Sequence, residues 1–274
     1  MIRCLFKGGD KMKKLGKVYL ALVMFFLYVP IFVLIVFSFN ESKSRSVFSG
    51  FTLDWYRKLF QNEIIISSLI NTLIIAVLAS VISTVLGTLA AIGINGMKKI
   101  PKAVVMNITN MPIINPEIVT GVSLMLLFVF FAARMNLEFG FVTLLIAHIT
   151  FDVPYVILNI MPKFRQMDPH LYEAAQDLGC SPYKAFMKVV LPEIMPGVVS
   201  GFLMAFTYSL DDFVISYFTS GSSSQTLPVT IYSMTRRKVS PEINALSTII
   251  FAVVVIILIV KNVIEIRQMK KKEA

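Results

Sequence analysis

The sequence predicts an all-α polytopic membrane protein with six transmembrane helices. Hydrophobic residues make up 56% of its 274 positions, and the mean hydropathy is +0.76. The apolar residues gather in long runs, and a helix needs about 20 such residues to cross the hydrocarbon of a bilayer. Strands can span lipid only in a closed barrel, and the sequence lacks the alternating pattern of barrel strands.

The six expected spans lie within one transmembrane domain, residues 18–264, between basic tails at residues 1–17 and 265–274. The expected spans are residues 18–39, 65–94, 103–131, 139–161, 193–217 and 245–260. The second and third exceed the length that lipid requires, so we expect tilting or a break. The third contains Asn115-Pro116, which breaks a helix. We expect the first to be an uncleaved signal anchor, because it is too long for a signal peptide and lacks a small-residue cleavage site.

Lys and Arg side chains predict the orientation. They gather in the two tails, between the second and third spans, and between the fourth and fifth spans. The positive-inside rule places these segments, and therefore both termini, in the cytoplasm. The net charge of +10 then fits the inner membrane surface and needs no nucleic-acid partner. Cys4 and Cys180 fall on this side, where thiols stay reduced, so we expect neither a disulfide nor a metal site.

The cytoplasmic loop at residues 163–192 has the pattern of two short amphipathic helices. Asp168-Pro169 begins the first helix by the cap-then-proline signal, and Gly179 ends it. Ser181-Pro182 begins the second in the same way. We expect Leu191-Pro192 to turn the chain back into the fifth span.

The first of these short helices has an apolar face that allows two interpretations. Residues at helical spacing on this face are Leu171, Ala174, Ala175 and Leu178. The helix could lie on lipid headgroups. Alternatively, its small Ala residues could let another protein approach closely.

The loop resembles a motif of the permease subunits of bacterial ABC importers. The motif is Glu-Ala-Ala, three residues, Gly, nine residues, then Ile, any residue and Leu-Pro. The matching positions are Glu173, Ala174, Ala175, Gly179, Val189, Leu191 and Pro192, with Val in place of Ile. The resemblance implies the type I permease fold, in which these helices sit in a groove of a separate ATPase subunit. Closure of the ATPase dimer then turns the permease from inward-facing to outward-facing.

The chain carries no G-x-x-x-x-G-K-[ST] loop and no constellation of catalytic residues. We therefore expect that it is not an enzyme and needs no cofactor of its own. ATP would be bound and hydrolysed by the partner subunit.

Acidic residues within the spans are candidates for a substrate path, because each costs about 2.5–3.5 kcal/mol on insertion scales. They are Glu117, Asp152, Asp211 and Asp212. Acids without bases suit a cationic substrate, since anion sites use Arg, Lys or helix N-termini. The alternative is that neighbouring helices hydrogen-bond each acid. In particular, His148 and Asp152 could simply pair, because they lie four residues apart on one helix face.

Tyr28 is a further candidate for the substrate path. It precedes Pro30 in the first span and could stack on an alkylammonium chain. An aromatic side chain in a span can equally serve packing.

A second resemblance concerns the permeases of spermidine/putrescine importers, and it is closest to the PotC type. It is carried by residues 147–155, 209–216 (SLDDFVIS), 227–234 and 239–246. It implies a polyamine substrate and a carboxylate at Glu117, whereas Asp152 is not a position associated with that family.

The same resemblance implies a system of several parts. A second homologous permease, an ATPase dimer and an extracytoplasmic polyamine-binding protein would assemble with this chain in the inner membrane. The outer loops at residues 40–64 and 218–244 would dock the binding protein. Trp55-Tyr56 would be an aromatic anchor there, or else belong to the aromatic belt of the membrane interface.

Several alternatives stay open at this stage. The same importer class could carry ferric ion, sulfate, phosphate or an opine-like amine. An ion-coupled secondary transporter would use the acids to carry protons, and a scaffold or receptor would transport nothing. The residues also leave open the choice between spermidine and putrescine.

Overall fold

The computed structural model describes residues 5–42, 47–135, 138–168, 170–237, 241–253, 255–256 and 259. The chain divides into two compact units. Unit 1 comprises the described parts of Met1–Glu63 and Ser233–Ala274, and unit 2 is Ile64–Tyr232. In the described part of the chain the regular structure is helical, with one isolated bridge between Asn40 and Phe51.

Unit 1 contains α1 (Leu5–Ser38), α2 (Asp54–Gln61) and the helix Pro241–Val253. Most of the apolar stretch Gly16–Ser38 of α1 is not buried within the chain, as expected for a helix that faces lipid. Trp55 of α2 is buried, and its indole N–H donates to the carbonyl of Asn40 at 2.7 Å. Trp55 is therefore part of the core of unit 1 rather than an exposed anchor.

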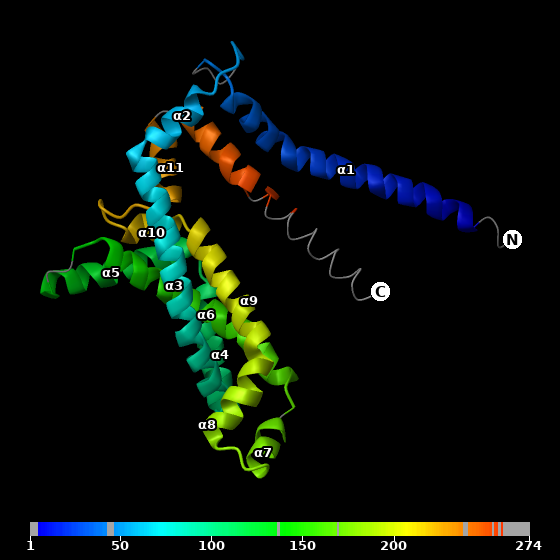
Figure 1. Cartoon of the computed structure of the whole chain (residues 1–274), viewed down its shortest axis with the longest axis vertical. Helices are drawn as coiled ribbons and strands as arrows, with labels where there is room; N and C mark the ends of the chain where they lie inside the picture. The colour runs from blue at the N-terminus through cyan, green and yellow to red at the C-terminus, as the bar shows by residue number, and fades with distance from the viewer. Residues whose placement is uncertain are drawn as a thin grey trace. The chain divides into compact units, whose positions relative to one another are not determined.

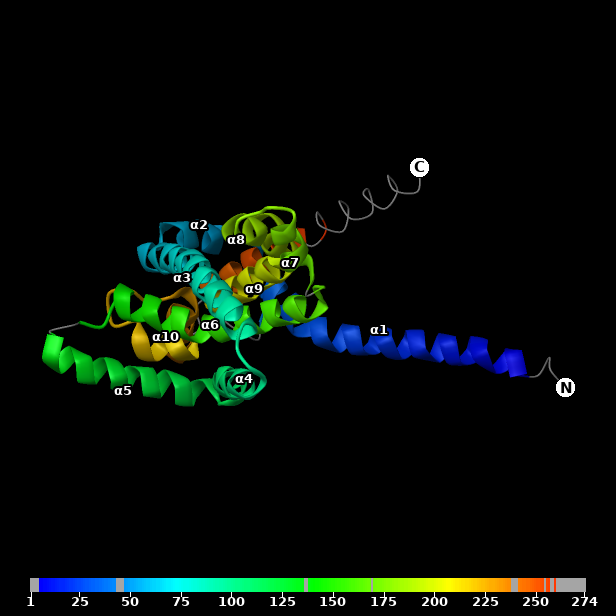
Figure 2. The same ribbon diagram turned by 90° about the horizontal axis from the view of Figure 1, so that it is seen from below.

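Unit 2 holds most of the described helices (Figure 1). They are α3 (Glu63–Asn95), α4 (Lys99–Ile114), α5 (Glu117–Met135), α6 (Phe141–Gln166), α9 (Leu191–Asp211), α10 (Val214–Thr219) and α11 (Leu227–Arg237). The loop elements α7 (His170–Asp177), α8 (Pro182–Ala185) and the π-helix η2 (Phe186–Val190) precede α9. In both views α6 runs beside α9, and α10 packs on α5 (Figures 1 and 2).

Two glycines allow α9 to lie directly against α6. A Cβ built on Gly197 would come 2.9 Å from the carbonyl oxygen of Asn159, and one on Gly201 would come 3.1 Å from the Cα of Val156. Small residues four apart are a common way for membrane helices to approach closely. The pair therefore fixes the spacing of the two helices.

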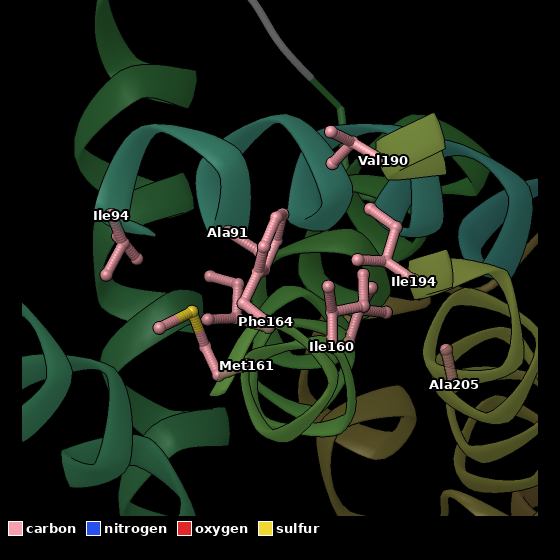
Figure 3. Close-up of a cluster of buried hydrophobic side chains, with 10 residues drawn as sticks. Ala91, Ile94, Ile160, Met161, Phe164, Val190, Ile194 and Ala205 are labelled. Carbon is pink, nitrogen blue, oxygen red and sulfur yellow. The ribbon is translucent and has the colours of Figure 1, made fainter. Parts of the chain in front are cut away.

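A buried apolar cluster fills the space around this contact (Figure 3). Its labelled members are Ala91, Ile94, Ile160, Met161, Phe164, Val190, Ile194 and Ala205. They come from α3, α6, the π-helix and α9, so the cluster ties the end of α9 nearest the loop to the rest of unit 2.

Apart from the fifth, the expected spans agree with the helices to within a few residues. Among the described residues, five helices are long and apolar enough to cross a membrane. They are Gly16–Ser38, Glu63–Asn95, Glu117–Arg134, Phe141–Gln166 and Pro182–Asp211. The third expected span is interrupted as predicted, because Asn115 is extended between α4 and α5. The sixth corresponds to Pro241–Val253, and parts of residues 254–260 lie outside the described residues.

The fifth span differs from the prediction at both ends. The chain does not turn at Leu191-Pro192, because the backbone stays helical from Pro182 to Asp211. The N–H of Leu191 bonds the carbonyl of Phe186. This wider π turn accommodates a proline ring that would clash with an α-helical backbone. At the other end the helix stops at Asp211, before residue 217, because Asp212 is extended.

Candidate functional site

A break in the helical backbone separates α9 from α10 and carries two adjacent carboxylates. Asp212 has ψ 121°, which ends α9. Its side chain accepts hydrogen bonds from the backbone N–H groups of Ile215 at 3.2 Å and Ser216 at 2.7 Å. Asp212 thus satisfies the first turn of α10 in the manner of an N-cap.

His148 lies behind this break, fully buried on α6. Its Nε2 is 3.0 Å from the hydroxyl of Ser216 and 3.6 Å from a carboxylate oxygen of Asp212. Its Nδ1 is 3.1 Å from the hydroxyl of Ser209 on α9. The ring therefore joins α6, α9 and the start of α10.

Asp152, also fully buried, belongs to the same network. The hydroxyl of Ser209 donates to its Oδ2 at 2.7 Å. Its Oδ1 has no hydrogen-bond partner in the part of the chain that is described. The contact with His148 is therefore made through Ser209, and the direct contact of the imidazole with a carboxylate is with Asp212. Sequence spacing alone missed Ser209, which lies 61 positions from His148.

Glu117 and Asp211 have different surroundings from Asp152 and Asp212. Both are exposed, and each stands where a helix begins or ends. Glu117 follows the extended Asn115-Pro116, and Asp211 is the last residue of α9. Within the described residues neither carboxylate takes part in a hydrogen bond or an ion pair. These two carboxylates are therefore accessible to a ligand.

The sequence analysis did not identify an aromatic cluster on α6 and α9. Tyr155 of α6 and Tyr208 of α9 have ring centroids 4.4 Å apart. Phe151 packs edge-on against both rings, with centroid distances of 6.0 Å to Tyr155 and 6.4 Å to Tyr208. The spacing of four residues between Phe151 and Tyr155 was the available signal, because it places both rings on one helix face.

Tyr28 belongs to a different unit of the chain from the four acids. Tyr28 is 39% exposed on α1, which belongs to unit 1, whereas the four acids belong to unit 2. Its contribution to a substrate path stays a prediction.

The ends of the two loop helices have the local structure that the sequence predicts. His170 N–H donates to the side chain of Asp168 at 2.9 Å, whereas Pro169 lies outside the described residues. Gly179 ends α7 with φ +85°, and the N–H of Cys180 bonds the carbonyl of Ala175 at 3.1 Å. This is the Schellman arrangement at a helix C-terminus. Ser181 caps the next helix by accepting from the N–H of Lys184.

The apolar face expected on the first loop helix is split in the structure. Ala175 is buried, whereas Leu178 lies beyond the end of α7 and is 86% exposed. Tyr183 of α8 is 73% exposed and Leu171 is 39% exposed. Glu173 and Ala174 are also exposed. The loop therefore exposes several apolar side chains and the acidic side chain of Glu173.

Comparison with a protein-family model identifies the region 83–267. It matches the family described as "Binding-protein-dependent transport system inner membrane component". The match covers more than half of the chain and includes the loop motif, α6, α9 and α10.

Curated relatives cover nearly the whole chain. The chain is 39% identical to the putrescine transport system permease protein PotI of Escherichia coli strain K12, over 85% of this chain and 84% of that protein. It is 34% identical to the spermidine/putrescine transport system permease protein PotC of the same strain, over 96% of this chain and 95% of that protein. It is 36% identical to PotC of Haemophilus influenzae, over 91% of this chain and 96% of that protein.

Solved structures show the same fold. A permease chain in the crystal structure of a bacterial ABC transporter that imports the acidic polysaccharide alginate superimposes with a TM-score of 0.68 at 14% identity, covering 93% of this chain and 96% of that one. In the complex of such a transporter with its alginate-bound periplasmic protein, the TM-score is 0.72 at 19% identity, with 93% and 94% covered. At these identities the likeness concerns the fold alone.

Proposed function

Because the chain belongs to the family of binding-protein-dependent transport system inner membrane components, we propose that it is the permease subunit of an ATP-driven importer of polyamines. The observation that carries this proposal is the identity of 34–39%, over most of the chain, with permeases of putrescine and spermidine/putrescine transport systems. ATP hydrolysis belongs to a separate ATPase subunit.

The chemistry of unit 2 supports a cationic cargo. Glu117 and Asp211 are exposed carboxylates at helix breaks, and irregular backbone within a membrane domain is tolerated where it lines a cavity. An anion such as sulfate would be repelled by these groups. We therefore place the substrate path along them.

The loop supports an ATPase as a partner. Leu178, Tyr183 and Glu173 of the loop are exposed, and the loop continues into α9 as helical backbone. Movement of a docked ATPase would pass directly into α9, because a continuous helix moves as a rigid body. A second homologous permease and an extracytoplasmic binding protein complete the proposed assembly, and both termini of this chain face the cytoplasm.

Uptake in cells tests the cargo. A strain that lacks this gene and every other polyamine importer is complemented with the wild-type gene, and uptake of labelled putrescine, spermidine, sulfate and ferric ion is measured. We expect the deletion strain to lose polyamine uptake and the wild-type gene to restore it, while sulfate and ferric ion uptake stay unchanged. Rescue of sulfate or ferric uptake without polyamine uptake would contradict the proposal.

Substitutions at Gly179 test the coupling loop. Gly179→Val is strained at φ +85°, whereas Gly179→Asn tolerates this left-handed conformation. We expect the Val variant to reach the membrane but to recover less ATPase in a pull-down and to lose most uptake, with the Asn variant close to wild type. Equal recovery and uptake for both variants would contradict the assigned role.

A further inference from the structure

We propose that Tyr155 and Tyr208, with Glu117 and Asp211 on either side, form a binding site for an alkyl chain that carries an ammonium group at each end. The inference rests on the proposed function and assigns its substrate a place in this chain. Two observations support it. The first is the geometry of the ring pair. The second is that Glu117 and Asp211 form no hydrogen bond among the described residues, whereas Asp152 and Asp212 accept hydrogen bonds within the protein.

The ring pair is held in a fixed position. Tyr155 and Tyr208 come from α6 and α9, and their planes are inclined by 37° at a centroid distance of 4.4 Å. Phe151 supports both rings from the interior, where it is 9% exposed. His148 packs edge-on against Phe151 at 5.9 Å. The buried network of His148 at the α9–α10 break thus contacts the ring pair through Phe151.

The pair is accessible to a ligand. Tyr208 is 36% exposed and Tyr155 is partly buried. Neither phenol hydroxyl forms a hydrogen bond to another residue in the described ranges. Buried tyrosine hydroxyls usually have a partner, so both groups remain able to bond a ligand.

A carboxylate is associated with each tyrosine, one through its electrostatic influence and the other through helical spacing. Tyr155 experiences the electrostatic field of Glu117, and Asp211 lies three residues after Tyr208 on α9, a spacing that places both on one helix face. The neighbouring acids are engaged internally, since Asp212 caps α10 and Asp152 accepts from Ser209. The proposed site therefore combines the ring pair with two carboxylates, Glu117 and Asp211, that form no hydrogen bond or ion pair among the described residues.

This arrangement matches the chemistry of a diammonium alkane. The methylene chain packs on the rings, each ammonium group pairs with a carboxylate, and the ring faces attract the cation. A hard metal ion would need several oxygen ligands around one point. A monoamine would satisfy one carboxylate and leave the other without a cation.

Equilibrium binding tests the site. Labelled putrescine is titrated against the purified complex of both permeases and the ATPase, without binding protein. We expect Tyr155→Leu and Tyr208→Leu each to raise the Kd roughly three- to thirty-fold, which corresponds to a cation–π contribution of about 0.7–2 kcal/mol. Tyr208→Phe keeps the ring face and should stay within about threefold, and Tyr208→Trp should bind at least as tightly.

Phe206→Leu is the matched control. Phe206 is stacked on Phe202 in the same helix at 6.2 Å, but it lies two residues from Tyr208 and so on another face. We expect its Kd to equal that of wild type. If the wild-type complex binds and transports putrescine while both Leu variants bind it equally well, the inference is overturned and the proposed function stands. If the wild-type complex neither binds nor transports polyamines, the proposed function itself fails.

Discussion

At the scale of single residues, adjacent acids have separate tasks. Asp212 points inward, where it accepts from two backbone N–H groups and lies 3.6 Å from His148. Asp211 is exposed and has no such partner among the described residues. The extended backbone at Asp212 produces this difference, because it turns consecutive side chains in different directions.

The different tasks predict different effects of the same substitution. Asp211→Asn removes the free charge, and we expect polyamine uptake to fall at least about tenfold, the factor that 1.4 kcal/mol represents. Asp212→Asn keeps only one of the two oxygens that accept from the backbone N–H groups of Ile215 and Ser216. We therefore expect it chiefly to lower the thermal stability, with a smaller loss of uptake per folded permease. Both are checked by uptake normalised to the amount of permease in the membrane. A larger loss for Asp212→Asn than for Asp211→Asn would contradict the assignment.

Ser209 is expected to stabilise the buried network rather than to bind substrate. Ser209→Ala removes the hydroxyl that donates to Asp152 and that contacts the imidazole of His148. A buried polar group left without a partner costs about 1–3 kcal/mol. We expect a lower unfolding temperature of the detergent-purified protein. Asp152→Leu combined with Ser209→Ala removes both partners and should restore part of the stability. A single variant as stable as wild type would show that the contact contributes nothing.

At the scale of elements, the helix from Pro182 to Asp211 connects the loop to the acidic break. Its 30 residues span about 45 Å at 1.5 Å per residue, enough to cross the hydrocarbon. The π turn at Phe186–Val190 lets Pro192 sit within this helix without ending it. A force applied at the loop therefore reaches Asp211 through one element packed on α6.

Close packing of α9 on α6 gives a prediction for Gly197. A Cβ at this position would lie within 3.0 Å of the backbone oxygen of Asn159, so Gly197→Ala must push the helices apart. We expect a loss of stability of about 1–3 kcal/mol, measured by thermal unfolding. Gly93→Ala on α3 is the matched control, because its Cβ would meet nothing within 4 Å. Equal stability of the two variants would contradict the role of Gly197.

At the scale of the whole molecule, local signals predicted most of the fold. Hydropathy located the spans, Asn115-Pro116 located a break, and Gly179 and Ser181-Pro182 located the ends of the loop helices. These features depend on neighbours in sequence.

Features that depend on partners far along the chain were not predicted. The contact of His148 with Ser209 joins residues 61 positions apart, and the pairing of Tyr155 with Tyr208 likewise needs the packing of α6 on α9. Pro192 was interpreted as a turn because a proline usually ends a helix, and the π turn overrides that rule. Gly197 and Gly201, four residues apart, were a readable signal of helix packing.

The orientation of the chain is testable through Cys180. In a Cys4→Ser background, we expect a membrane-impermeant maleimide to label Cys180 in inside-out vesicles and not in spheroplasts, because the loop faces the cytoplasm. Val47 in the first outer loop is 60% exposed. Val47→Cys in a background without other cysteines should therefore give the reverse pattern. Labelling of Cys180 from the outside would overturn the proposed topology.

Accumulation of polyamine in proteoliposomes tests the central claim most directly. This chain, its partner permease and the ATPase are reconstituted with ATP on the ATPase side, and the loaded binding protein is added on the other side. We expect labelled putrescine or spermidine to accumulate above its equilibrium distribution, and to stop doing so when ATP is omitted or the ATPase is inactivated. Absence of accumulation, or accumulation that persists without ATP and collapses with an uncoupler, would contradict an ATP-driven polyamine permease.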